Sequence, residues 1–154
     1  GAERFLSVWE ALKVVKDQEY AGYVFIHDGA RPFVTEKIIA DTYEAAKVYG
    51  GCVAAMPVKD TIKIADKDGF ADVTPDRKLV WQIQTPQVFD KKLYLDAVKT
   101  VENSKNFTDD CMLLEAYGKK VKFVDGDYEN IKITTPEDVE LAENYIKRKG
   151  NNHA

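Results

Sequence analysis

The sequence predicts an α/β fold, because short apolar runs alternate along the chain with amphipathic helical patterns. The runs Gly22–His27 and Cys52–Met56 are typical of strands that are buried on both faces of a parallel sheet. A helical pattern separates them, so that strand, helix and strand form one βαβ unit. The 154 residues, of which 45% are hydrophobic, suit a single domain that spans 1–154.

Capping residues bound the helices in the first part of the chain. Apolar residues that recur at i, i+3, i+4 and i+7 predict a first helix over about 7–17, with Ser7 as its cap. Thr35 can cap the helix between the two strands, and Gly50 can end it. We therefore expect one helix before the first strand and one between the two strands.

A β-hairpin is expected after the second strand. Thr61–Ala65 alternates polar and apolar residues, Asp66–Gly69 is a turn signal, and Phe70–Val73 can return as the paired strand. Because this alternation leaves one face in water, we expect the hairpin to project from the domain as an arm over about 59–84. Such an arm could pair with another subunit.

The last part of the chain returns to alternating helices and strands. Asp90 is expected to cap a helix that runs to 102, and Thr108 another that ends at Gly118. Thr135-Pro136 is a strong helix start, because a capping side chain precedes proline at the first turn. The remaining elements are strands over Lys120–Val124 and Asn130–Ile133 and a final helix to about Lys149, followed by a frayed end from Asn151 to Ala154.

The composition excludes several classes of protein. The formal net charge of -4 argues against nucleic acid as the main partner. No apolar run approaches the ~20 residues that a membrane span needs, so we expect no membrane partner. Cys52 and Cys111 form no CxxC motif, which indicates reduced thiols in a cytoplasmic protein rather than a zinc site or a disulfide.

The residues after the first strand are the first candidates for a site, because α/β sheets bind ligands outside the carboxyl ends of their strands. Asp28 could hold a metal or orient a nucleoside triphosphate, and Arg31 could bind a phosphate bidentately. The alternative is structural: Asp28 caps a turn, Arg31 pairs with it, and His27 is a hydrogen-bonded strand end.

Two further groups of residues could bind a phosphorylated ligand. Thr108 and Lys132 lie near helix N-termini, which bind anions but are also ordinary caps. The hairpin and the segment after it supply basic side chains and hydroxyls that suit a phosphorylated polyol, although ion pairs on a solvated hairpin give the same pattern. These side chains are Lys59, Thr61, Lys63, Arg77 and Thr85.

Six segments of the chain, in order, are GAERFLSV, HDGARPF, PVKDTIK, DRKLVWQIQTPQVF, TDDCMLLEAYG and NIKITTPEDVELAE. In this order they resemble the 2-C-methyl-D-erythritol 4-phosphate cytidylyltransferase family over nearly the whole chain. The resemblance implies a Rossmann-like nucleotidyltransferase sheet and a homodimer in which the β-arm embraces the partner. It also implies that CMP is transferred from CTP to 2-C-methyl-D-erythritol 4-phosphate, with Mg²⁺ and release of pyrophosphate, in non-mevalonate isoprenoid biosynthesis.

The same resemblance assigns roles to single residues. Asp28 would bind the polyol near the metal, and Lys132 would stabilise negative charge where the 4-phosphate attacks the α-phosphorus, so both are candidate catalytic residues. The metal ligands stay unassigned. Candidates for binding the substrate are Arg31 and Thr108, with Thr61 and Arg77 from the partner's arm, and candidates for binding the nucleotide are Gly1, Ser7 and Gly29.

The family also opens with a strand and a Gly-rich phosphate loop that do not occur in these 154 residues. We therefore expect an N-terminally truncated member, the C-terminal two-thirds, that does not turn over CTP on its own. Two alternatives stay open. One is ribitol-5-phosphate cytidylyltransferase, which shares the fold, CTP and most of the motifs, and the other is a catalytically incompetent dimerising fragment.

Overall fold

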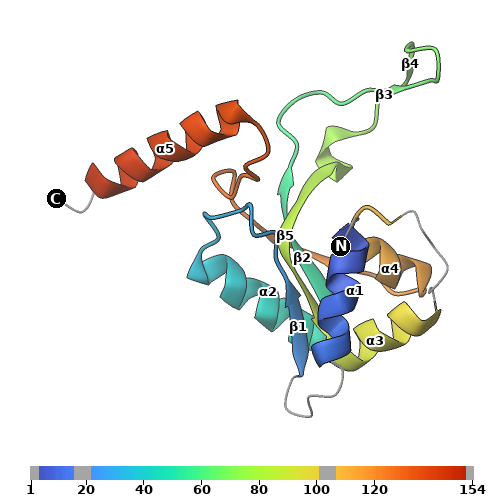
Figure 1. The fold of residues 1–154 in the computed structure, drawn as a ribbon. Helices are drawn as coiled ribbons and strands as arrows, with labels where there is room; N and C mark the ends of the chain where they lie inside the picture. Colours follow the sequence, from blue (N-terminus) through green and yellow to red (C-terminus); the bar gives the residue numbers. More distant parts are fainter. Residues whose placement is uncertain (1–3, 16–21, 101–106, 152–154) are drawn as a thin grey trace.

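A computed structural model describes residues 4–15, 22–100 and 107–151 (Figure 1). The central sheet in these residues is built from β1 (Tyr23–Ile26), β2 (Gly51–Pro57), β5 (Trp81–Asp90) and β6 (Lys122–Asp125). Its strand order is β1-β5-β2-β6. β5 runs antiparallel to β1 and to β2, whereas β6 is parallel to β2, so the sheet is mixed.

The prediction of a parallel sheet is wrong at β5. β1 and β2 run parallel to each other, as in the predicted βαβ unit, but β5 lies between them. Periodicity did not predict this strand, because Gln84, Thr85 and Gln87 interrupt its apolar pattern although all three are buried. Their polar atoms bond to loops that are distant in sequence.

Helices cover both faces of the sheet, and alternation along the strands separates two cores. Val53 and Phe89 pack with Leu12 on one face, whereas Cys52 and Val88 pack with α2 (Glu36–Tyr49) on the other. The sheet is thus the middle of three layers (Figure 1). The helices on the first face are α1 (Arg4–Val15), α3 (Lys91–Thr100) and α4 (Cys111–Ala116).

Three helix boundaries that capping residues predict are confirmed. The Thr35 hydroxyl accepts a hydrogen bond from the backbone N–H of Ile38 at 3.3 Å and so caps α2. Gly50 ends α2 in the left-handed conformation, with φ of 77°. At the start of α3, the Asp90 carboxylate accepts from the N–H of Leu93 at 2.8 Å.

Three other local predictions are wrong. Ser7 lies inside α1, which begins earlier, and therefore does not cap it. Thr108 does not cap α4, because the Asp109 carboxylate, a stronger acceptor, takes the N–H of Met112 at 3.0 Å. Residues 130–133 form a loop rather than a strand, since the loop after β1 accepts the N–H of Ile133.

The last helix, α5 (Pro136–Asn151), begins at the predicted start. The carboxylate of Asp138 accepts hydrogen bonds from the N–H groups of Thr134 and Thr135, and these bonds lower the pKa of Asp138. Asn151 is still helical, and the rest of the end that is predicted to fray, 152–154, lies outside the described residues. None of the described helices combines the length and apolar character that crossing a bilayer requires.

The predicted hairpin forms a separate small sheet of β3 (Ile64–Ala65) and β4 (Ala71–Val73). Figure 1 shows this arm projecting from the rest of the fold. The chain returns through a short 3-10 helix, η1 (Arg77–Leu79), after which Trp81 pairs with Pro57 in the central sheet. Residues 81–84 therefore belong to β5 and not to the arm.

Candidate functional site

A polar cavity of about 320 Å³ lies where β1 ends beside β5. Loops that leave the carboxyl ends of β1 and β6 meet there with β5 and with the loop before α4. This is the edge at which α/β sheets bind ligands. The lining residues are Asp28, Arg31, Ile83, Gln84, Thr85, Gln87, Thr108, Asp109 and Lys132.

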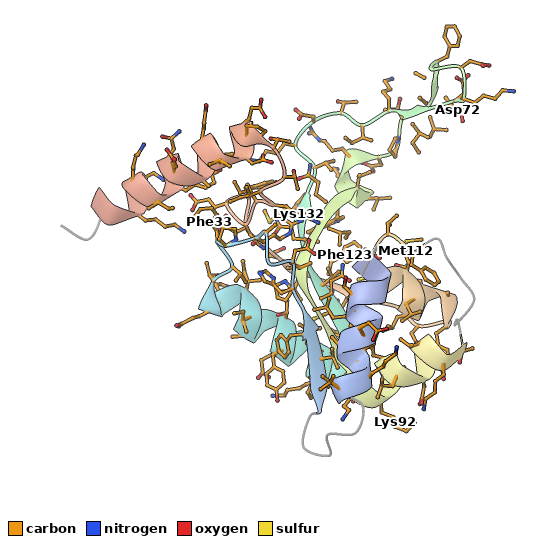
Figure 2. All side chains as sticks on the ribbon, viewed as in Figure 1. Phe33, Asp72, Lys92, Met112, Phe123 and Lys132 are labelled. Atoms are coloured by element: carbon orange, nitrogen blue, oxygen red, sulfur yellow. The ribbon has the colours of Figure 1, made fainter. Side chains whose placement is uncertain are left out.

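The charged centre of the cavity consists of Asp28, Arg31 and Lys132. The Nζ atom of Lys132 is 3.0 Å from Oδ2 of Asp28, and Nε of Arg31 is 3.6 Å from the same oxygen. The Asp28 side chain is 16% exposed and that of Lys132 is 42% exposed. Figure 2 shows Lys132 near the middle of the molecule, far from Asp72 on the arm. A covered carboxylate thus holds a lysine that a ligand can still reach.

Arg31 is held on two sides. Its Nη1 donates to the backbone oxygen of Asn130 at 2.8 Å, and its ion pair with Asp28 is the pairing that the structural alternative describes. Burial lowers the pKa of Arg31, while the charge of Asp28 opposes this effect, and an arginine remains a cation in either case. Its Nε is buried and lies beyond hydrogen-bond distance of Asp28, at 3.6 Å from Oδ2, so the contact between these two atoms is an ion pair.

The loop after β1 is fixed by the hydroxyl of Thr85 in β5. This oxygen accepts the N–H of Asp28 at 3.1 Å and lies 2.9 Å from Nδ1 of His27. The other ring nitrogen of His27 is 3.0 Å from the backbone oxygen of Arg31. A carbonyl can only accept, so Nε2 carries the proton and Nδ1 accepts from Thr85. His27 is therefore the hydrogen-bonded strand end that the structural alternative describes.

The loop before α4 brings Thr108 and Asp109 to the cavity, as the sequence predicts for Thr108. Asp110 points elsewhere: it is 2% exposed, and its Oδ1 accepts from the hydroxyl of Tyr94 at 2.6 Å. Its N–H donates to Oε1 of Gln87 at 3.0 Å, which ties this loop to β5. Asp109 therefore lines the cavity, whereas Asp110 makes buried hydrogen bonds to Tyr94 and Gln87.

The arm residues lie away from this cavity in the single chain. Thr61 is exposed at the root of the arm. Arg77 donates from Nη1 to the backbone oxygen of Lys59 at 2.9 Å. The Nζ of Lys59 in turn lies 3.5 Å from the centre of the Tyr128 ring, whose hydroxyl donates to Pro57. Thr61 and Arg77 are thus not brought to Asp28 within one chain.

Two of the three candidate nucleotide residues, Ser7 and Gly29, lie outside the cavity lining. Ser7 is exposed on α1, at a separate and mostly apolar hollow of about 310 Å³ beside β1. Gly29 is exposed next to Asp28, and a Cβ placed on it would meet no atom within 4 Å. Gly1 lies outside the described residues.

Some lining residues were not predicted as site residues. Gln84, Gln87 and Asp109 reach the cavity, and Thr85, considered only with the hairpin, belongs to β5. The available signal is a run of polar residues, Gln84–Gln87, flanked by Ile83 on one side and Val88 on the other. Buried polar side chains inside a strand need hydrogen-bond partners, so such a run predicts contacts with other segments of the chain.

The carboxylates of Asp28 and Asp109 are the hard oxygen ligands at this cavity. In the part of the chain that the structure describes, no cluster of three or more His, Cys, Asp and Glu side chains could hold a metal ion. Mg²⁺ commonly binds one or two carboxylates together with substrate phosphates. Two carboxylates fit a site of that kind; Asp28 already pairs with Lys132 and Arg31, and Asp109 accepts the N–H of Met112.

Comparisons with known proteins agree with the geometry. The family model for 2-C-methyl-D-erythritol 4-phosphate cytidylyltransferase matches residues 1–148. Relatives of that name from Caldanaerobacter subterraneus and Lachnospira eligens are 51% and 50% identical, over 96% of this chain. The chain spans 65% of the length of both relatives.

Solved structures give the same result. The 4-diphosphocytidyl-2C-methyl-D-erythritol synthase of Anaerococcus prevotii superimposes with a TM-score of 0.87 at 41% identity, over 94% of this chain and 64% of that one. The 2-C-methyl-D-erythritol 4-phosphate cytidylyltransferase of Thermus thermophilus gives 0.83 at 34% identity, over 96% and 70%.

Proposed function

Since the chain belongs to the 2-C-methyl-D-erythritol 4-phosphate cytidylyltransferase family, we propose that its cavity serves the transfer of CMP from CTP to 2-C-methyl-D-erythritol 4-phosphate. Pyrophosphate is released, and the product enters non-mevalonate isoprenoid biosynthesis. The observation that carries this proposal is the charged centre, in which Arg31 and Lys132 converge on Asp28 at the cavity.

The reaction needs positioning and charge neutralisation rather than a protein nucleophile. An oxygen of the 4-phosphate forms a bond to the α-phosphorus of CTP, and the bond from that phosphorus to the bridging oxygen of the β-phosphate breaks. The electron pair leaves with pyrophosphate, and the attacking phosphate needs no general base. Lys132 would stabilise the charge that develops during attack, and Arg31 would hold the acceptor phosphate.

Asp28 would have two tasks. Its carboxylate would accept hydrogen bonds from hydroxyls of the polyol, and it would hold Mg²⁺ together with the phosphates of CTP. When bound, the metal neutralises part of the phosphate charge. The ion pair with Lys132 and the N–H bond to Thr85 support this assignment, because they fix Asp28 at the cavity before a ligand arrives.

We also propose a homodimer in which the arm of one subunit brings Thr61 and Arg77 to the partner's cavity. Support comes from the position of both residues on a projecting element and from its exposed apolar side chains. The most exposed of these are Phe70 at 72% and Leu79 at 79%.

For the nucleotide we keep Gly1, Ser7 and Gly29, and for the acceptor also Thr108, as proposed contacts. Thr108 has the direct support of lining the cavity. A cytoplasmic location is likewise a proposal, supported by Cys52 and Cys111, which are both free and buried.

The test is a steady-state assay of pyrophosphate release from CTP with 2-C-methyl-D-erythritol 4-phosphate. The enzyme in the assay is the protein expressed from the complete reading frame that encodes this chain. Ribitol 5-phosphate is the comparison substrate. The proposal expects turnover with the first acceptor and little with the second, and the reverse preference would overturn it. The same assay, with size-exclusion chromatography and CTP titration, tests the expectation that the 154-residue chain alone is inactive.

A further inference from the structure

We propose that Asn130 is a positioning residue for the charged centre, an inference that rests on the proposed function. Its carboxamide fastens the loop that carries Lys132 to β5, and its backbone oxygen fastens Arg31. Asn130 does not line the cavity and touches no substrate in this proposal. It acts through the two cations.

The contacts of Asn130 connect three parts of the site. Its side chain is fully buried, and Nδ2 donates to Oε1 of Gln84 at 3.2 Å and to the backbone oxygen of Thr85 at 2.9 Å. Its own backbone oxygen accepts from Nη1 of Arg31 at 2.8 Å. One residue thus links the loop after β6, the middle of β5 and the loop after β1.

The direction of the carboxamide is fixed by its neighbours. Gln84 bonds to the backbone of Asp127, accepting its N–H at Oε1 (3.3 Å) and donating from Nε2 to its oxygen (2.8 Å). Gln84 therefore presents an acceptor to Asn130, and the carbonyl of Thr85 is a second acceptor. Only a side chain that donates two hydrogen bonds satisfies both, so an aspartate of the same shape would not.

Lys132 depends on this attachment. Its side chain is 42% exposed and pairs with Asp28, so the place of the ammonium group depends on that ion pair and on the backbone of the loop. Ile133 also joins this loop to Ala30, through an N–H bond of 2.8 Å to its backbone oxygen. Asn130 provides the side-chain attachment two residues before the lysine. A displacement of about 1 Å at a reacting group can lower a rate about 10²-fold.

The side-chain hydrogen bonds of Asn130 come from its amide nitrogen, which donates to Gln84 and Thr85. Its Oδ1 is buried and has no hydrogen-bond partner among the described residues. Kinetics with and without Lys132 distinguish a positioning role from a purely structural one.

The experiment compares Asn130→Asp and Asn130→Ala with wild type in the complete protein, using CTP and 2-C-methyl-D-erythritol 4-phosphate. We expect kcat/KM for the acceptor to fall about 10- to 10²-fold, while KM for CTP changes less than about 3-fold. In a Lys132→Ala background, Asn130→Asp should lower kcat by a smaller factor than it does in wild type, because one of the two cations that it positions is gone.

Thr42→Val is the matched control for lost stability. Thr42 is as deeply buried as Asn130, and its hydroxyl bonds within α2 at 2.7 Å from the backbone oxygen of Ile38. This variant should have a lowered melting temperature with wild-type kinetics.

Several results would overturn the inference. They are wild-type kcat/KM in a folded Asn130→Asp protein, an equal loss of rate with and without Lys132, or failure of both Asn130 variants to fold, which would assign the residue to the core. If wild type itself does not turn over these substrates, the proposed function fails instead, so the two failures are distinguishable.

Discussion

Replacing Lys132 with alanine removes one of the two cations that line the cavity and leaves both carboxylates, Asp28 and Asp109. The formal charge of these four side chains changes from zero to one negative, at the place where the phosphate of the proposed reaction would bind. Loss of one preorganised stabilising contact commonly lowers kcat by ~10²-10³, or about 2.7–4 kcal/mol of barrier. We expect a loss of that size for Lys132→Ala.

The same substitution should hardly change folding. The Lys132 side chain is 42% exposed, and Asp28 keeps Arg31 as an ion-pair partner. Pairs of this kind contribute up to about 1 kcal/mol. Lys92→Ala is the matched control, because Lys92 is 86% exposed and pairs with Asp96 at 2.7 Å on α3, away from the cavity (Figure 2).

The assay measures kcat and KM with both substrates, together with urea unfolding, for wild type and the two lysine variants. Lys92→Ala should match wild type in rate, and both variants should match it in free energy of unfolding to within about 1 kcal/mol. Near wild-type turnover by folded Lys132→Ala would refute the catalytic assignment. An equal loss in Lys92→Ala would show that the effect is not local to the cavity.

Further substitutions and one labelling experiment test other contacts. A Cβ at Gly126 would lie 2.3 Å from Oε1 of Gln84, which hydrogen bonds hold in place, so Gly126→Ala should lower the free energy of unfolding by about 1–3 kcal/mol in urea. An unchanged value would contradict the tight approach. Gly29→Ala meets no atom within 4 Å and should change that free energy by less than about 0.5 kcal/mol, and a clear loss would show that this position is constrained. Burial raises the pKa of Cys52 to about 12 and that of Cys111 as well, so Ellman's reagent should label neither thiol in the native chain and both after unfolding. Rapid labelling of the native chain would show that the thiols are accessible.

Local signals predicted the parts of the fold that local chemistry decides. Thr35 and Gly50 bound α2 because a cap and a left-handed glycine act within one turn of the helix. The arm follows from alternation around a turn. The pairing of Arg31 with Asp28 was also within reach, since the two residues lie three positions apart.

The missing predictions share a different cause. The sequence of β5 has a polar pattern because it contains Gln84 and Thr85. Both side chains are buried, and they form hydrogen bonds to loops that lie far away in the sequence. The Asp28–Lys132 pair likewise joins the ends of two strands that neither composition nor periodicity connects. Family resemblance could place both residues at one site. The attachment of the loop through Asn130 could not be predicted, because its partners Gln84 and Thr85 are brought to it only by the fold.

The position of β5 between β1 and β2 sets the order in which the molecule can assemble. During synthesis β1 and β2 are made before β5, and in the native sheet they are joined only through this strand, which ends at Asp90. Pairings between such distant segments form slowly. The cavity comes later still, since its last cation reaches Asp28 only after the chain has been made as far as Lys132. A chain that ends just before that point contains the residues of all four central strands but lacks the last cation of the charged centre.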